Sequence, residues 1–265
     1  MAEQTADENK YPIFDYLNGN VPNSKPSDAL LQIAVKTLET DQFETRSRYD
    51  FFFACFSGKQ DTLSQWRAYA SDASGYSIGF HTEDLKNEWI DSLLSHGDTI
   101  DVLQVKYDEK LQRRMIRKTI EIVTRDFDAA VRSVCLERDE KITTIPSADL
   151  VASLLRLALH FKHLRFSKEK EWRLIYSKTK PEVCFTENDK LPVRTRVSQE
   201  QLIPYVAIPL CKSDERLRLE SVMMGPKCNA GIEQLESDFA LNQLLCELQN
   251  GKPTNGIKHS SIPYC

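Results

Sequence analysis

The alternation of apolar and polar positions along the chain predicts long helices mixed with short strands. Apolar residues recur every three or four positions over 108–138 and 147–163, the spacing of one face of a helix. Shorter apolar or alternating runs predict strands at 50–57, 75–81, 100–107, 171–177, 193–197, 205–210 and 219–224. Further helices are predicted at 27–40, 61–71, 82–94 and 232–249, and a last strand at 256–261.

This order of elements predicts an α+β fold with a mixed, largely antiparallel sheet packed by several helices, two of them long. The aromatic run at 50–57 is typical of a strand buried on both faces, which places it at the centre of the sheet. Residues 1–25 are rich in Asn, Gly, Pro and Ser, and we expect a poorly ordered lead-in there. Residues 26–265 are then expected to form a single domain.

The composition of the chain indicates where the protein is located and which partners it lacks, but it indicates little about catalysis. A net charge of −4 gives no general attraction to nucleic acid or to anionic membranes. The N-terminus lacks the apolar segment of a signal peptide, and no run of about 18 apolar residues exists to span a bilayer. We therefore expect a soluble, cytoplasmic protein without a membrane partner. The seven cysteines lack a Cys-x-x-Cys spacing, so most are expected to be buried free thiols rather than zinc ligands or disulfides.

A first cluster of candidate residues follows the end of the strand at 50–57. It comprises Ser57, Trp66, Tyr69 and Gly75, contributed by a strand end, a helix and a turn. Trp66 and Tyr69 are three positions apart and share a helix face, which provides either a stacking surface for a planar ring or a packing edge on the sheet.

A second cluster lies where the chain enters the strand at 171–177. In extended chain, Glu169, Glu171 and Arg173 point to one face, whereas Lys170 and Trp172 point to the other. Two carboxylates beside a guanidinium could hold a sugar hydroxyl and stabilise a developing cation, or could form a surface ion pair. No Cys accompanies the histidines at a metal-binding spacing, so no metal is expected. Dinucleotide-binding, Walker and nucleophile-elbow motifs are all missing from the sequence.

Several pieces of the sequence share an order and spacing that together are more specific than any one of them. They are Cys55-Phe56-Ser57, Trp66-x-x-Tyr69, Gly75 to Gly79-Phe80, Lys162-x-x-x-Phe166-x-x-Glu169-x-Glu171-x-Arg173, Gly225-Pro226 and Ser261-Ile-Pro-Tyr264. Over roughly residues 50–264 this pattern resembles the bacterial domain-of-unknown-function 2971 family. The resemblance implies no settled activity. We further infer a similarity to ADP-ribosyltransferase-like enzymes of toxin or anti-phage systems. These enzymes act on NAD with a Glu-x-Glu motif on a strand late in the chain.

That similarity implies roles for the candidate residues, with NAD as substrate and an unnamed protein or nucleic-acid acceptor. Glu171 would stabilise the oxocarbenium-like transition state, and Glu169 would position the acceptor. Trp66 or Tyr69 would stack on nicotinamide, and Ser57 would lie near the ribose. The family's early Tyr-(Lys/His)-Tyr strand, a source of NAD contacts, is not found here.

Two alternatives stay open at this point. One is a non-catalytic defence or sensor module that binds a nucleotide or a protein, with Glu169, Glu171 and Arg173 as a structural ion network. The other is a nuclease, for which the sequence offers no convincing set of carboxylates for Mg²⁺.

Overall fold

The structure is a computed structural model, and it describes most of the chain. The described residues are 26–39, 49–137, 146–180, 189–198, 200–215, 217–228, 232–249 and 255–263. The predicted lead-in at 1–25 lies outside them. Contacts divide the chain into two compact units, one formed by Met1–Asp50 and Lys106–Phe161 and the other by Phe51–Val105 and Lys162–Cys265. No observation tests the single-domain prediction, which stays a prediction.

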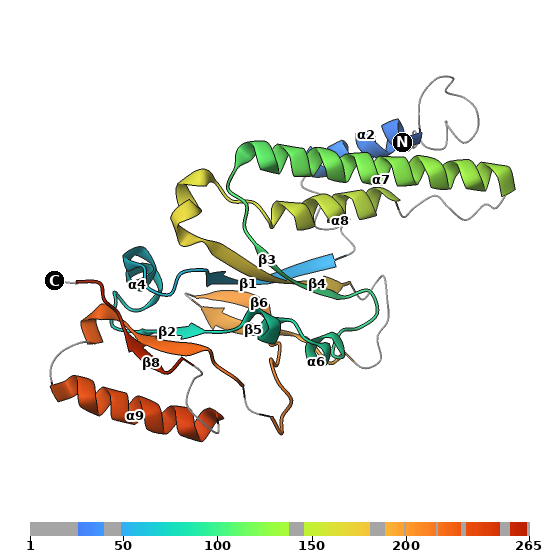
Figure 1. The fold of residues 1–265 in the computed structure, drawn as a ribbon. Helices are drawn as coiled ribbons and strands as arrows, with labels where there is room; N and C mark the ends of the chain where they lie inside the picture. The colour runs from blue at the N-terminus through green and yellow to red at the C-terminus, as the bar shows by residue number, and fades with distance from the viewer. Residues whose placement is uncertain are drawn as a thin grey trace, which may run out of the picture. The chain divides into compact units, whose positions relative to one another are not determined.

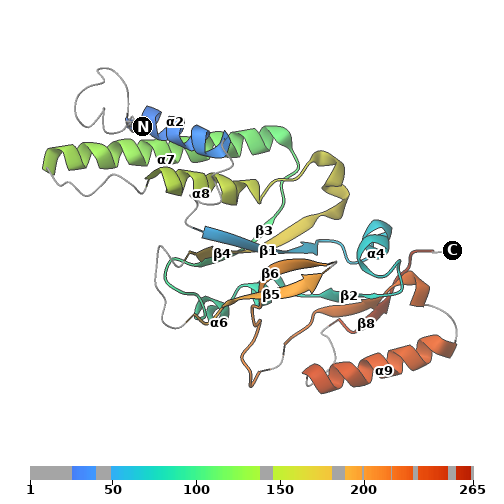
Figure 2. The same ribbon diagram turned by 180° about the vertical axis from the view of Figure 1, so that it is seen from behind.

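Within the described residues, the first unit contains three helices: α2 (Pro26–Glu39), α7 (Glu109–Glu137) and α8 (Pro146–Ala158). They lie side by side in both views (Figures 1 and 2). The backbone N–H and the hydroxyl of Ser27 both donate to the Asp128 carboxylate at 2.9 Å, which fixes the start of α2 on α7. The apolar face of each helix is buried, and the core residues are Leu30, Ala34, Phe127, Leu150 and Val151.

In the second unit, the described strands form three sheets. The first has the order β1 (Tyr49–Ser57), β4 (Glu171–Thr179), β3 (Thr99–Gln104). The second has the order β2 (Tyr76–Gly79), β7 (Ser221–Met224), β8 (Ile257–His259), and the third is the hairpin of β5 (Val193–Ser198) and β6 (Gln201–Val206). The β3–β4, β2–β7 and β5–β6 pairs are antiparallel and β7–β8 is parallel, so the predicted α+β class with largely antiparallel strands is confirmed.

Short helices connect these strands: α4 (Leu63–Tyr69), α5 (Thr82–Leu85), α6 (Glu88–Asp91) and the 3₁₀ turns η1 (Leu164–Glu169) and η2 (Pro226–Cys228). The longer α9 (Ile232–Gln249) lies alongside β2, β7 and β8 (Figures 1 and 2). The largest core of the unit comprises Leu85, Ile90, Leu93, Ile100, Leu174, Tyr176 and Leu191. None of the helices in the described ranges is both long and apolar enough to cross a membrane.

Several element predictions were wrong in position. The strand at 50–57 lies at the edge of its sheet rather than at the centre, and Phe53 on it is 56% exposed. An apolar run specifies a strand but not whether its second face is covered. The single helix predicted at 82–94 is two short helices, because the Asn87 side chain accepts a hydrogen bond from Ile90 N–H and starts α6 anew. The helix predicted at 147–163 ends at Ala158.

Candidate functional site

The candidate residues of β4 occupy its two opposite faces. Leu174 and Tyr176 face the core together with Phe52 and Phe56 of β1, and Trp172 shares their side by the two-residue period of a strand. Glu171 and Arg173 therefore point the other way. The site has two parts: a charged cluster on the Glu171 face and a cavity on the Trp172 face.

The charged cluster consists of Glu169, Glu171, Lys162 and Arg173. Glu171 is 4% exposed, and its Oε1 accepts a hydrogen bond from Arg173 Nε at 2.7 Å. Its Oε2 accepts from Lys162 Nζ at 2.7 Å, and the same ammonium donates to Glu169 Oε2 at 2.6 Å. Two carboxylates thus face two cations, so the cluster is balanced in charge.

These contacts control protonation in the cluster. Burial would raise the pKa of Glu171, but hydrogen bonds from Arg173, Lys162 and Cys55 outweigh it and lower that pKa to about 2. Burial would lower the pKa of Lys162, but the two carboxylates outweigh it and raise that pKa. Glu171 is therefore ionised at neutral pH.

Cys55 on β1 reaches the same cluster from the neighbouring strand. Partial burial, its hydrogen bond to Glu171 and repulsion by that carboxylate raise the pKa of the Cys55 thiol to about 11. The expectation that most cysteines are buried was wrong for the ones described: Cys55 and Cys246 are exposed, and Cys211 and Cys228 are partly exposed. Cys55 is nonetheless a protonated, weakly nucleophilic thiol.

The route by which Glu169 joins the cluster differs from the prediction. Glu169 is the last residue of η1 rather than part of an extended strand, and Lys170 after it has a positive φ of 47°. The carboxylate is brought to Lys162 by the turn, not by strand alternation. A simple surface ion pair is also wrong for Glu171, given its burial.

The residues of the first predicted cluster divide between separate environments. The Ser57 hydroxyl donates to the Glu169 carbonyl oxygen at 3.0 Å, which places it beside the charged cluster. Trp66 is 3% exposed, packs with Ala73 and Met223, and donates from Nε1 to Asp61 at 2.7 Å. Its buried ring therefore offers no free face for nicotinamide to stack on.

Tyr69 and Gly75 belong neither to the charged cluster nor to the cavity on the Trp172 face. Tyr69 is 78% exposed, so it shares no ligand-facing surface with the buried Trp66. Gly75 closes the turn after α4: its N–H donates to the Ala70 carbonyl at 2.9 Å, and its own carbonyl accepts from Gly225 N–H at 2.9 Å. Trp66, Tyr69 and Gly75 are thus not brought together with Glu171, whereas Ser57, Glu169 and Arg173 are.

A cavity of about 530 Å³, which we name the Trp172 cavity, lies on the other face of β4. Its lining mixes hydroxyl, amide and charged groups with aromatic and aliphatic ones, and comprises residues 55–60, 77–80, Thr82, Leu85, Val102, Trp172, Glu220 and Ser221. Two glycines allow the walls to approach closely. A Cβ on Gly58 would lie 2.9 Å from the Lys170 carbonyl oxygen, and one on Gly79 would lie 2.6 Å from the Ser221 hydroxyl.

The sequence did not single out the most important lining residues of this cavity. Trp172 lies between two residues that were selected, and the two-residue strand period already placed it on the opposite face. Glu220 and Ser221 belong to a strand start about 50 positions later, which carries no motif. Gln60 donates to the Ser221 hydroxyl at 2.6 Å and joins the two walls, a contact that only the fold reveals.

Comparison with known families agrees with the resemblance seen in the sequence. Residues 65–174 match the family DUF2971, described as a protein of unknown function. This segment, less than half of the chain, is similar to the DUF2971 family. It includes β2, Trp172 and the charged residues from Lys162 to Arg173, so the DUF2971 segment supplies parts of both faces of the site. No curated protein and no solved structure matched the chain.

No group of three or more His, Cys, Asp or Glu side chains arranged to hold a metal ion occurs within the described ranges.

Proposed function

We propose that this protein is a nucleotide-binding module and that the nucleotide occupies the Trp172 cavity. The observation that carries the proposal is the cavity itself: its volume of about 530 Å³ is within the range of small-molecule sites, and its lining combines the Trp172 indole with polar and apolar side chains. Trp172 and Phe80 offer aromatic surface to a planar base. Ser57, Ser77 and Glu220 can hydrogen-bond ribose hydroxyls.

Among the described lining residues, Lys59 is basic and Glu220 is acidic. Lys59 lines the cavity and is exposed, so its ammonium can pair with a phosphate. Lys59 follows the Gly58 backbone N–H, which is already used by the Lys170 carbonyl at 2.8 Å. A phosphate would therefore depend on the Lys59 side chain rather than on this backbone group.

Binding is favoured over catalysis because of where Glu171 lies. It does not line the cavity, and both of its carboxylate oxygens are held by cations at 2.7 Å. A group that stabilises a developing charge must contact the reacting atoms. The arrangement supports a structural role for Glu169, Glu171 and Arg173 behind the cavity wall.

NAD cleavage or ADP-ribosyl transfer is the second candidate, and one observation favours it. Cys55 and Ser57 line the cavity and also contact the charged cluster, Cys55 through Glu171 and Ser57 through the Glu169 carbonyl. The ionised Glu171 carboxylate therefore lies behind the β1 wall. A rearrangement of β1 on binding would be required to expose it to NAD.

The test is calorimetric titration of the whole protein with NAD, ADP-ribose and ADP. We expect saturable binding that Trp172→Leu weakens by about tenfold or more and that Trp172→Phe largely preserves, because phenylalanine keeps an aromatic face. Lys59→Ala should weaken binding and flatten its salt dependence, whereas Lys168→Ala, an exposed lysine outside the cavity, should not.

The same samples separate the two candidates. Incubation with NAD followed by chromatography should show binding without release of nicotinamide. Release by the wild-type protein would establish the enzyme instead. Absence of binding by all three ligands, or equal binding by Trp172→Leu, would remove the nucleotide site.

A further inference from the structure

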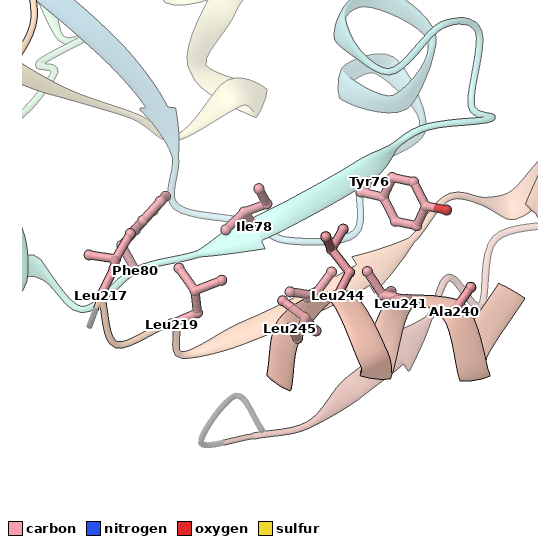
Figure 3. Close-up of a pocket in the computed structure, with 10 residues that line it drawn as sticks. Tyr76, Ile78, Phe80, Leu217, Leu219, Ala240, Leu241, Leu244 and Leu245 are labelled. Carbon is pink, nitrogen blue, oxygen red and sulfur yellow. The ribbon is translucent and has the colours of Figure 1, made fainter. Parts of the chain in front are cut away.

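A second cavity, separate from the Trp172 cavity and apolar in character, lies between the β2–β7 sheet and α9. Its volume is about 690 Å³. Figure 3 shows Tyr76 and Ile78 projecting from β2 and Leu241, Leu244 and Leu245 from α9, with the space between the two rows. We name it the α9 cavity.

The lining of the α9 cavity is almost uniformly aliphatic or aromatic. No charged side chain is among the residues that line it in the described part of the chain, and the phenol of Tyr76 supplies its side-chain hydroxyl. Val222 and Leu245 are the most buried residues of the lining, at 2% and 5% exposed. An unpaired charge would be strongly disfavoured in such surroundings, so a ligand must be uncharged where it enters.

The mouth of the cavity leaves large apolar side chains in contact with water. Tyr76, Ile78 and Leu244 are 51%, 53% and 49% exposed, and all three line the same hollow. Single exposed apolar residues are ordinary, but a group of them around one concavity indicates an interaction site.

We propose that the α9 cavity binds a small, uncharged, largely apolar molecule. The volume lies within the range of small-molecule sites and is enclosed from several sides by β2, β7, α9 and the segment at 217–219. A helix with side chains is about 10 Å across and needs a longer open groove, so a small molecule fits better than a protein segment.

The probe is phenylnaphthylamine, an uncharged aromatic molecule with a single N–H whose fluorescence rises in apolar surroundings. Titrated against the whole protein, it should bind saturably. Leu244→Trp and Ala240→Phe add bulk to the cavity from α9 and should weaken binding by about tenfold or more. Both positions are exposed, so the larger side chains are compatible with folding, which a circular dichroism melt checks.

The matched control is Phe239→Trp, on the same helix, 67% exposed and outside the cavity lining. It should bind the probe like the wild type. Ile78 and Phe80 border both cavities, so variants on α9 are used because this helix does not line the Trp172 cavity. Lack of saturable binding by the wild type, retention of affinity in both bulky variants, or an equal loss in the control would overturn the proposal. Nucleotide binding should be unchanged in all three variants, which keeps this test independent of the proposed function.

Discussion

Glu171 holds its charge at a position where only 4% of the residue is exposed, and the groups around it explain how. Lys162 and Arg173 each contact one carboxylate oxygen at 2.7 Å, so the cost of burying the charge is offset by two charge-assisted hydrogen bonds. Removing the carboxylate would leave both cations without this partner. The residue is therefore expected to matter for stability before it matters for chemistry.

We predict that Glu171→Gln lowers the free energy of unfolding by about 3 kcal/mol at pH 7. The folded-state pKa of Glu171 is lowered from 4.5 to about 2, so its stabilisation is complete above pH 4.5 and is lost as the pH falls towards 2. The difference between wild type and variant should shrink over that same window. Urea unfolding at a series of pH values measures it.

Glu121→Gln, at an exposed position on α7, is the control and should change the unfolding free energy by less than about 0.5 kcal/mol. A Glu171→Gln penalty that stays constant down to pH 2 would show that the carboxylate charge is not what stabilises the fold. The same result would reopen the catalytic interpretation of Glu171, since its structural role is the main argument against it.

At the scale of elements, Asp61 joins α4 to the residues that follow β8. Its Oδ1 accepts hydrogen bonds from Trp66 Nε1 and from the Ser260 hydroxyl, both at 2.7 Å, and its Oδ2 accepts from Ser261 N–H at 3.0 Å. Burial would raise the pKa of Asp61, but these donors outweigh it and lower the pKa. The N-cap of α4 is Thr62, which makes no side-chain cap bond.

We predict that Asp61→Ala lowers the free energy of unfolding by about 2 kcal/mol, because four donors, the Ser261 hydroxyl included, lose a charged acceptor. Amide hydrogen exchange at Ser261 should accelerate more than exchange in β4, since the Ser261 N–H bonds directly to the carboxylate. Asp91→Ala, at an exposed position on α6, is the control. Unchanged exchange at Ser261 would show that the residues after β8 are held by other contacts.

Long helices were predicted well from the sequence, and short elements were not. The helix at 108–138 is α7 within a residue at each end, because an apolar face sustained over many turns leaves little ambiguity. The segment 82–94 carries the same helical signal but is interrupted by Asn87, whose side chain competes for a backbone N–H. The prediction of extended chain at Glu169 was wrong for a related reason. Lys170 has a left-handed backbone conformation, which turns the chain at this point.

At the scale of the molecule, the pairing of strands determines which residues become neighbours in the site, and the sequence alone did not predict this pairing. The alternation of β4 predicted that Glu171 and Arg173 share a face, and they do share one cluster. Which strand lies beside them depends on contacts between residues more than 100 positions apart, such as Ser57 with Glu169. Ser221, which helps to form the Trp172 cavity, is likewise brought in by pairing with Gly79. Local sequence patterns do not predict which distant residues will pair.

The division into two units leads to a prediction about folding. Lys106 and Phe161 form a parallel bridge at the point where the chain enters and leaves the first unit, and Lys106 N–H donates to the His160 carbonyl at 2.7 Å. A short glycine linker could therefore replace 107–160. We predict that a chain of residues 49–106 joined to 161–265 unfolds cooperatively and binds nucleotide and phenylnaphthylamine like the whole protein, because the core clusters of the second unit draw on its own residues.

Leu174→Ala gives this experiment an internal comparison, because Leu174 is 5% exposed in the main core of the second unit. The substitution should lower the free energy of unfolding by about 3 kcal/mol in both the whole and the shortened chain. An equal penalty means that the core is packed in the same way without the helices of the first unit. A shortened chain that lacks a cooperative transition, or one in which Leu174→Ala costs nothing, would instead support one domain across 26–265, and the two binding sites would then depend on the complete chain.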